Sequence, residues 1–290
     1  MILKQRKEGK SITNVYLHNK ILKFTTLIIA SLGLNIVAMN YSQSVHAATL
    51  TIPKGYTYSR VLKAHEHRIS KKEYNNLVSA SIQGMKYSNY HDTSVRDQNL
   101  IVTPTRLTKN QNKEISKFAL STINSARKQL HRRKWTYDSR VEKMAKNVAR
   151  YYYSDNASCW DPDHDYHAIN LAAKHAGLRT GGNMYEDEAG LPTSDKWNGS
   201  TRSMAVLKEQ VYFNIKQMLF GGYTGQDYND RSLYTEYDHA SDLLGVGKYQ
   251  PKTKMFGLAF SDLKHDHSKI SVHMINVSKD HVLDYKKFNK

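Results

Sequence analysis

The sequence predicts an α+β domain in which helices pack against a small antiparallel sheet. In residues 108–218, apolar side chains recur at the three-to-four-residue spacing of amphipathic helices. Near the C-terminus the period changes to two, which is typical of strands, in residues 255–260 and 270–277. Helices early and strands late indicate this fold class. The single cysteine, Cys159, excludes an intramolecular disulfide, so a packed core must hold the fold.

Residues 1–47 are predicted to be a secretory signal peptide. A basic region reaches Lys23, an apolar stretch follows at residues 24–39, and Val45-His46-Ala47 forms a small-residue cleavage pattern. The apolar stretch is short for a bilayer span and contains Asn35. The C-terminus shows neither a sorting motif nor a hydrophobic tail. We therefore expect a secreted product without a transmembrane anchor after cleavage.

Residues 48–107 form an N-terminal leader before the main domain. The stretch 50–56 is predicted to be extended, and residues 61–78 are predicted to be helical. The leader has too few periodic apolar positions to form a domain alone. It is expected to pack against the main domain or to space it from the cell surface.

The main domain, residues 108–282, is predicted to begin with helices. Two capping boxes mark helix starts, one at Thr108 with Gln111 and one at Ser139 with Glu142. Glycines mark two helix ends, at Gly177 and at residues 221–222. The predicted helices cover these apolar-periodic stretches: 113–130, 139–152, 169–176, 204–218 and 238–244.

Two strands close the domain, residues 255–260 and 270–277, and nine polar residues between them predict a hairpin loop. His265 and His267 lie in that loop. Two alternatives are open for them: solvated surface positions, or weak chelation of a metal. His273 alternates with apolar neighbours, so it is predicted to face solvent. Residues 283–290 form a basic C-terminal tail.

The charge of the chain favours anionic partners. The formal net charge is +17, and removing the six basic residues and one acid of the first 47 positions leaves 37 basic and 25 acidic groups, or +12. Such a balance promotes adhesion to wall polymers, acidic glycans, lipid headgroups or nucleic acid. No nucleic-acid-binding motif, nucleophile elbow, phosphate-binding loop or dinucleotide fingerprint is present, which argues against nucleic acid as the partner.

Residues 163–190 carry the chemistry. His164 comes before a short predicted helix, and Glu186 comes after a glycine-bearing turn at residues 181–182. An imidazole and a carboxylate delivered from two loops can share a cavity, bind a metal or move a proton.

Several motifs in fixed order give a resemblance to a known family. They are INSAR (123–127), HDYHAINLAAKHAGL (164–178), MYEDEAG (184–190), VYFNIKQMLF (211–220) and DHASDLLGVG (238–247). Their order resembles the CAP superfamily of cysteine-rich secretory, antigen 5 and pathogenesis-related proteins. The segments TIPKGYTYSRVLKA (51–64) and GMKYSNY (84–90) are similar to the leader of its Gram-positive surface exclusion branch. The resemblance covers about residues 50–280, although the chain lacks the family's cysteines.

This resemblance implies an α-β-α sandwich with a cavity lined by two histidines and two glutamates. His164 and His239 match the histidines, and Glu186 matches the first glutamate, in Tyr-Glu-Asp rather than the family's Gly-Glu-Asn. The second acid is open between Glu209 and Glu236. His164, Glu186 and His239 would suffice to bind Zn²⁺ or another divalent cation, to act as a general acid and base, or to hold two loops together.

The resemblance and the export signal together predict a secreted CAP-like binding protein, retained at the cell wall by charge. Its partners would be anionic cell-wall or host-surface polymers or a surface protein. Its role would be surface exclusion, which limits contact between cells in conjugation, or interaction with a host or wall. The alternative is a metal-assisted hydrolase that uses His164, Glu186 and His239. The absence of catalytic motifs favours the binding protein.

Overall fold

A computed structural model describes residues 50–192, 199–222, 225, 227–247 and 253–290. These residues belong to one compact unit, Ser44–Lys290. The predicted signal peptide, residues 1–47, lies outside the described residues.

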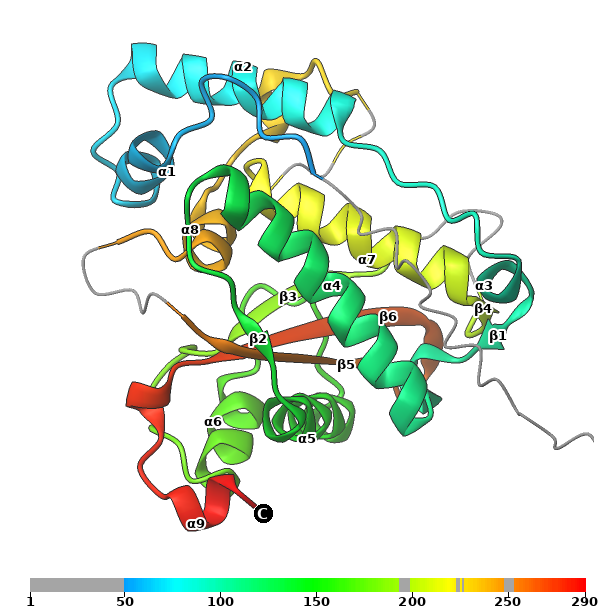
Figure 1. Ribbon diagram of the computed structural model, residues 1–290. Helices are drawn as coiled ribbons and strands as arrows, with labels where there is room; N and C mark the ends of the chain where they lie inside the picture. The colour runs from blue at the N-terminus through cyan, green and yellow to red at the C-terminus, as the bar shows by residue number, and fades with distance from the viewer. Residues whose placement is uncertain (1–49, 193–198, 223–224, 226, 248–252) are drawn as a thin grey trace, which may run out of the picture. The chain divides into compact units, whose positions relative to one another are not determined.

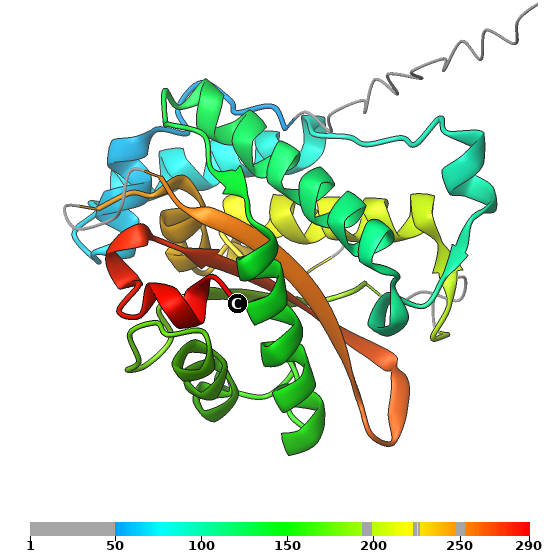
Figure 2. The same ribbon diagram turned by 60° about the horizontal axis from the view of Figure 1, so that its bottom comes forward.

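A four-stranded sheet forms the centre of the unit, in the order β2-β5-β6-β3. β5 (Met255–Leu263) and β6 (Asp266–Val277) form the predicted antiparallel hairpin. Its strands are longer than expected, because most of the nine polar residues belong to the strands, although the register shifts between Asp262 and Leu263. Figure 2 shows the hairpin in orange and red, with its turn at the far end from α9. β3 (Glu186–Gly190) pairs antiparallel with β6, and β2 (Thr136–Tyr137) pairs parallel with the start of β5.

Helices cover both faces of this sheet (Figure 1). On one face lie α4 (Lys109–Gln129), α7 (Met204–Leu219) and α8 (Asp238–Leu244). On the other face lie α5 (Ser139–Asp155) and α6 (Tyr166–His175). Strand alternation supplies both cores: Phe256 and Leu258 pack with the first group, whereas Met255 and Ala259 pack with the second. The α-β-α sandwich is therefore confirmed.

Capping residues set the helix starts next to the sheet. Thr108 and Gln111 form the predicted capping box of α4. The capping box predicted at Ser139 and Glu142 is wrong, because Asp138 is the N-cap of α5 and accepts a hydrogen bond from the backbone N–H of Arg140. Glu142 is buried instead and accepts hydrogen bonds from the hydroxyls of Ser116 and Tyr137.

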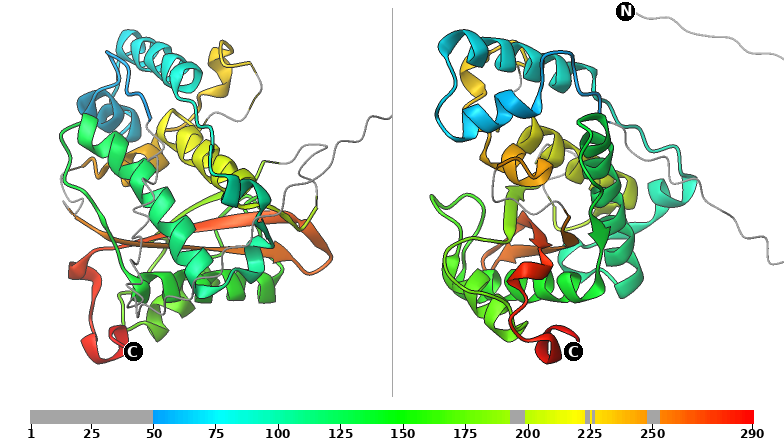
Figure 3. Two further views of the ribbon diagram at one scale, coloured as in Figure 1. Left: turned by 45° about the vertical axis from the view of Figure 1, so that its right-hand side comes forward. Right: turned by 60° about the vertical axis from the view of Figure 1, so that its left-hand side comes forward.

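The leader folds into α1 (Tyr58–His65), α2 (Lys71–Tyr87), α3 (Val95–Asn99), β1 (Ile101–Val102) and η1 (Pro104–Arg106). The single helix predicted over 61–78 is two helices, because Ser70 caps a new start by accepting from the backbone of Glu73. β1 pairs with β4 (Arg202–Ser203) in a separate two-stranded sheet. Figure 3 shows α1 and α2 outside the layer of α4 and α7.

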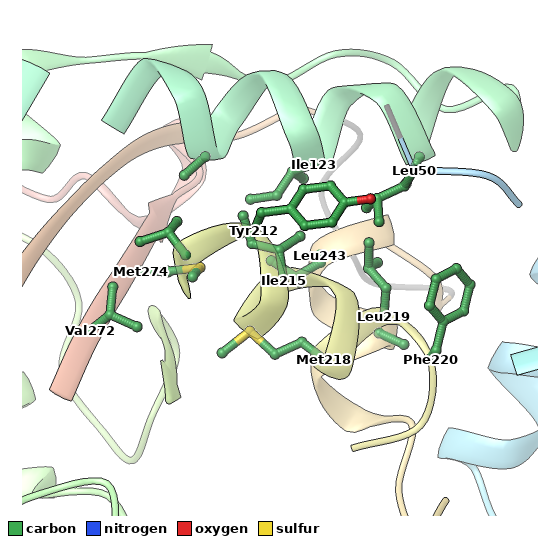
Figure 4. Packing of buried hydrophobic residues seen from close by; sticks show 14 of the residues in the cluster. Leu50, Ile123, Tyr212, Ile215, Met218, Leu219, Phe220, Leu243, Val272 and Met274 are labelled. Atoms are coloured by element: carbon green, nitrogen blue, oxygen red, sulfur yellow. The ribbon is translucent and has the colours of Figure 1, made fainter. Parts of the chain in front are cut away.

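The leader and the main domain share one hydrophobic core. Leu50, Val61 and Leu77 are fully buried in the same cluster as Ile123 of α4 and Ile215 of α7. In the close view of Figure 4, Leu50 and Ile123 lie beside side chains of α7, and Val272 and Met274 of β6 lie at the end of the cluster away from Leu50. The predicted packing of the leader against the domain is present in this core. The domain boundaries at 107 and 282 stay predictions.

The C-terminal residues also pack on the unit. After η3 (Lys279–His281), α9 (Tyr285–Phe288) buries Phe288 against the α5 side of the sheet. The guanidinium of Arg140 lies 4.5 Å from the centre of the Phe288 ring. Part of the predicted basic tail, residues 283–290, is thus held by the fold.

Candidate functional site

Two neighbouring strands place acids and a histidine on one face of the sheet. Glu188 of β3 lies directly opposite His273 of β6, and Glu186 lies two residues before Glu188. Because side chains alternate along a strand, all three face α5 and α6, whereas Asp187 faces the opposite layer. Tyr152, near the end of α5, is buried against this face.

Glu186 is the centre of a hydrogen-bond network, the acid–histidine cluster. Its Oε1 lies 2.7 Å from Nδ1 of His273, and its Oε2 lies 2.9 Å from Nδ1 of His164. The hydroxyl of Tyr152 donates to the Oε2 atoms of Glu186 at 2.8 Å and of Glu188 at 3.2 Å. The structure therefore brings together His164 and Glu186, two of the residues selected from the sequence, and adds Tyr152, Glu188 and His273 to them.

Burial sets the electrostatics of this cluster. Burial raises the pKa of Glu186, but the hydrogen bonds from His164 and His273 overcome it and lower that pKa to about 2. Glu188 lacks equally close cations, and burial raises its pKa to about 7. Burial lowers the pKa of His273, yet its bond to Glu186 raises it overall. Glu186 is thus charged at neutral pH, whereas Glu188 is close to its own pKa there.

The way into the cluster is through His164. Its side chain is 25% exposed, whereas the side chains of Glu186 and His273 are fully buried and that of Glu188 is 5% exposed. His164 belongs to the loop before α6, and the next residue, Asp165, caps that helix by accepting from Ala168. The cap fixes the loop, so the imidazole is held against Glu186.

The cluster fits a divalent cation. One ligand atom each from His164, Glu186 and Glu188 lies within 4.8 Å of the others. Among the described residues, nothing donates a hydrogen bond to the buried Oε1 of Glu188, as would suit a cation ligand. Nitrogen and carboxylate oxygen are ligands that Zn²⁺ accepts. A second group with such spacing, Asp155, Asp165 and His167, lies mostly at the surface.

His239 lies apart from this cluster, on the other side of the sheet. It belongs to α8, and its Nδ1 is 2.9 Å from Oε1 of Glu236. Burial lowers the pKa of His239, but the hydrogen bond that its imidazole donates to Glu236 and the charges of Glu236, Asp187 and Asp238 raise it to about 9. Asp187, the strand neighbour of Glu186, faces this side. The sheet therefore separates the two predicted histidines, and each has its own glutamate.

The two residues predicted as the possible second acid both lie outside the acid–histidine cluster. Glu236 is the partner of His239, and Glu209 is exposed on α7. The prediction that His273 faces solvent is wrong. Its side chain is 0% exposed, because α5 and Tyr152 cover that face of the sheet. The sequence signal for this buried position was a histidine that follows the two-residue period of a strand and pairs with an acidic strand. Zinc binding by His164, Glu186 and His239 stays a prediction.

A cleft of about 430 Å³ lies along the outer edge of β5, which we call the β5-edge cleft. Its walls come from η1, the start of α4, the second half of α5 and the hairpin. Arg106, Lys146 and Arg150 are its exposed basic residues, and Tyr153 is an exposed aromatic beside them. The three basic side chains cannot be selected from the sequence, because their convergence depends on how η1 and α5 meet.

Comparisons with known proteins identify the fold. No family model and no curated protein matches the sequence. Among solved structures, the chain is similar to the CAP domain of Enterococcal PrgA, with a TM-score of 0.62 and 22% identity over 82% of this chain and 89% of that chain. The fold is thus a CAP-type α+β sandwich. Within the described residues, every helix is too short or too polar to cross a bilayer.

Proposed function

We propose that this chain is a secreted CAP-like binding protein that acts at the surface of a Gram-positive cell. The similarity to a CAP domain, the resemblance of the leader to the surface exclusion branch and the export signal support it. The formal charge of +12 after residue 47 favours retention at an anionic wall.

The β5-edge cleft is the observation that carries this proposal. A concave site with a few converging charged and aromatic side chains is typical of binding sites. Arg106 and Arg150 stand free of carboxylate partners among the described residues, so their charge is available to a ligand. The acid–histidine cluster, by contrast, is largely saturated by contacts within the protein.

A retention assay tests the binding function. The purified chain lacking residues 1–47 is incubated with intact Gram-positive cells, isolated cell walls and host matrix at about 150 mM salt. We expect retention by at least one of them, weakening as salt rises because the attraction is largely electrostatic. If none of the three surfaces retains the protein at this salt, the proposal is contradicted.

The finer role in surface exclusion has its own test. Recipient cells that produce the chain should receive conjugative plasmids less often than recipients that lack it, because the bound protein hinders contact between cells. Transfer frequency is the measurement. An unchanged frequency, together with retention at the wall, would remove surface exclusion and leave the binding function.

A metal-assisted hydrolase is the second candidate, favoured by Oε1 of Glu188, which accepts no hydrogen bond from the described residues and has its nearest cationic group among them, Nδ1 of His273, at 3.9 Å. His164, Glu186 and Glu188 would hold the cation, and a bound Zn²⁺ would supply Lewis-acid activation of water. His164 is the exposed member through which a substrate would approach. Tyr152 would keep both carboxylates in position.

Metal analysis separates the two possible ligand sets. After incubation with Zn²⁺ and removal of the excess, metal content is measured in the wild type, Glu188→Gln and His239→Ala. The cluster predicts that Glu188→Gln loses zinc and His239→Ala keeps it, and the opposite pattern would favour the set predicted from sequence. Absence of zinc from the wild type, with no hydrolysis of peptides or wall fragments, would contradict the hydrolase.

A further inference from the structure

The outer edge of β5 is only partly paired. Alternate residues of an antiparallel strand direct their main-chain groups to the same side. The carbonyl of Phe256 accepts from Asp138, and the N–H and carbonyl of Leu258 bond to Ser116 and Asn112 of α4. The main-chain groups of even-numbered residues therefore point away from β6.

Phe260 and Asp262 continue this edge into the β5-edge cleft. Both residues line the cleft. By the same alternation, their N–H and carbonyl groups point outward, up to the register shift that follows Asp262. Among the described residues, no main-chain group outside the hairpin bonds to them. β2, the neighbour of β5, ends at Tyr137, opposite Phe256. Although the Phe260 side chain is buried, the cleft thus borders two donors and two acceptors in the arrangement of a strand that lacks a neighbour.

The charges beside this free edge have one sign. Arg106 of η1 and Arg150 of α5 are exposed, and Arg150 stacks on Tyr151 at 4.9 Å rather than pairing with an acid. Lys146 also lines the cleft, one turn before Arg150 on α5, and is bonded to Glu142. The one acid of the described lining, Asp262, has its Oδ2 2.8 Å from Nδ1 of His267. A ligand in the cleft therefore meets a net positive field.

We propose that the β5-edge cleft binds an extended acidic peptide segment of a partner protein, which adds to the sheet as a strand beside β5. Main-chain bonds to Phe260 and Asp262 supply the pairing, and the basic rim selects the charge. The inference rests on the proposed binding function and names the class of partner. A peptide is favoured over a polysaccharide or polyphosphate as the ligand, because those polymers lack the backbone amides that match a strand edge.

The geometry specifies the peptide. Side chains of an added strand alternate between the two faces of the sheet. One set would point toward Arg150 of α5, and the other toward Arg106 of η1. Two neighbouring acids in an otherwise β-prone segment therefore satisfy both arginines. A fluorescein-labelled Thr-Val-Glu-Glu-Val-Thr peptide meets this description, and Thr-Val-Lys-Lys-Val-Thr is its charge-reversed counterpart.

Fluorescence anisotropy measures binding of these peptides to the purified chain. We expect the acidic peptide to bind at least about tenfold more tightly than the basic one. Arg106→Glu with Arg150→Glu should weaken binding of the acidic peptide about tenfold or more. Lys71→Glu with Lys72→Glu, in the exposed first turn of α2, makes the same change in net charge and should alter binding less than about twofold.

Backbone pairing is tested separately from charge. Two versions of the acidic peptide carry N-methyl groups on alternate amides. Each version blocks the amides that point to one edge of the peptide strand. One of them should lose about tenfold or more in affinity, because it cannot donate to β5. Amide hydrogen exchange in residues 257–263 should slow when the unmethylated peptide binds, since Phe260 and Asp262 gain partners.

Three outcomes would overturn the inference: no binding of the acidic peptide up to about 1 mM, equal losses in the cleft variant and in the Lys71/Lys72 control, or full binding by both methylated peptides. The last outcome would identify an anion site without strand pairing. If the peptide fails while cells or walls still retain the protein, the inference fails and the binding function stands. If neither binds, both fail.

Discussion

At the scale of single residues, Glu186 decides the character of the acid–histidine cluster. Both of its oxygens are occupied, one by His273 and the other by His164 and Tyr152. A fully buried carboxylate is tolerated only with such partners, because an unpaired buried charge would cost several kcal/mol. The carboxylate therefore ties β3, β6, α5 and the loop before α6 into one network.

Replacing Glu186 by Gln should destabilise the fold by about 3 kcal/mol at pH 7, since both histidines lose their charged acceptor. The folded-state pKa of Glu186, about 2, lies below its unfolded value of about 4.3. Its stabilisation is therefore present above about pH 4.3 and is lost as pH falls toward 2. Urea unfolding at pH 7 and pH 3 measures the difference between wild type and variant, which should shrink at pH 3.

Glu209→Gln is the control for this prediction. Glu209 is exposed on α7, so the substitution should change the free energy of unfolding by less than about 0.5 kcal/mol. Equal effects of the two substitutions would show that Glu186 does not hold the network. A difference that is independent of pH would contradict the lowered pKa.

The sequence predicted part of this cluster and missed the rest for a physical reason. His164 and Glu186 were found because they flank a short helix and match a family pattern. His273 was assigned to solvent because its neighbours Val272 and Met274 are apolar. That assignment assumes a sheet with one wet face, but α5 covers the second face, so polar residues there are buried partners.

At the scale of elements, α5 lies unusually close to the sheet at Gly257. A Cβ atom at this position would come 2.4 Å from the backbone nitrogen of Glu142 and 2.5 Å from its Cα. Backbone cannot yield as a flexible side chain does, so α5 would have to move outward. The glycine thus sets the distance at which Tyr152 reaches Glu186.

Gly257→Ala should therefore destabilise the protein by about 2 kcal/mol or more, through overpacking between α5 and β5. Thermal unfolding followed by circular dichroism checks this. Gly199→Ala is the matched control, because a Cβ there would meet its first neighbour only at 4.0 Å, so its midpoint should stay near that of the wild type. Unchanged stability of the Gly257 variant would disprove the tight approach.

A second element-scale contact anchors α3 to α4 and α7. The ammonium of Lys208 on α7 is bonded to Asp97 of α3 and lies 2.9 Å from Oε1 of Glu114 on α4. Lys208 and Asp97 are almost fully buried, with side-chain exposures of 9% and 5%. Arg96 completes the group by bonding to both acids.

Lys208→Met should cost about 3 kcal/mol, because it leaves Asp97 buried with less compensating charge. Burial raises the pKa of Glu114, but the bonds from Arg96 and Lys208 lower it overall. Its contribution is thus present above its unfolded pKa and is lost as pH falls below it. Urea unfolding should show a gap between wild type and variant that narrows on acidification, whereas the exposed Lys174→Met should match the wild type at every pH.

Element prediction succeeded where local signals were complete. The capping box at Thr108 and the short helix at residues 238–244 needed no tertiary information. The predicted hairpin strands are too short because Asp266, Ser268 and Lys269 are polar, yet all three belong to β6, on a part of the hairpin that reaches solvent. The β5-edge cleft has no sequence signature, since residues of η1 and α5 become neighbours only after folding.

At the scale of the whole molecule, the leader and the sandwich form one core rather than two. Met85 and Val78 of α2 are buried in the same cluster as Phe220, which follows α7. The hydroxyl of Tyr74 on α2 also donates to the carbonyl of Tyr234, which follows α7 in the sequence. Removal of α1 and α2 would expose apolar surface of the sandwich, so the leader and the sandwich should unfold together.

Leu77→Ala tests this unity. Leu77 is fully buried on α2 in the shared core, so the truncation should cost about 2–5 kcal/mol of the stability of the entire unit. Urea unfolding is followed by far-ultraviolet circular dichroism and by hydrogen exchange of segments within α2 and within β6. Both segments should lose protection at the same urea concentration, which should be lower than in the wild type. Leu283→Ala is the control: this side chain is 67% exposed, so the urea midpoint should stay at the wild-type value. If α2 unfolds in Leu77→Ala while β6 keeps the wild-type midpoint, the leader is a separate unit, and the boundary predicted at residue 107 is a real division of the fold.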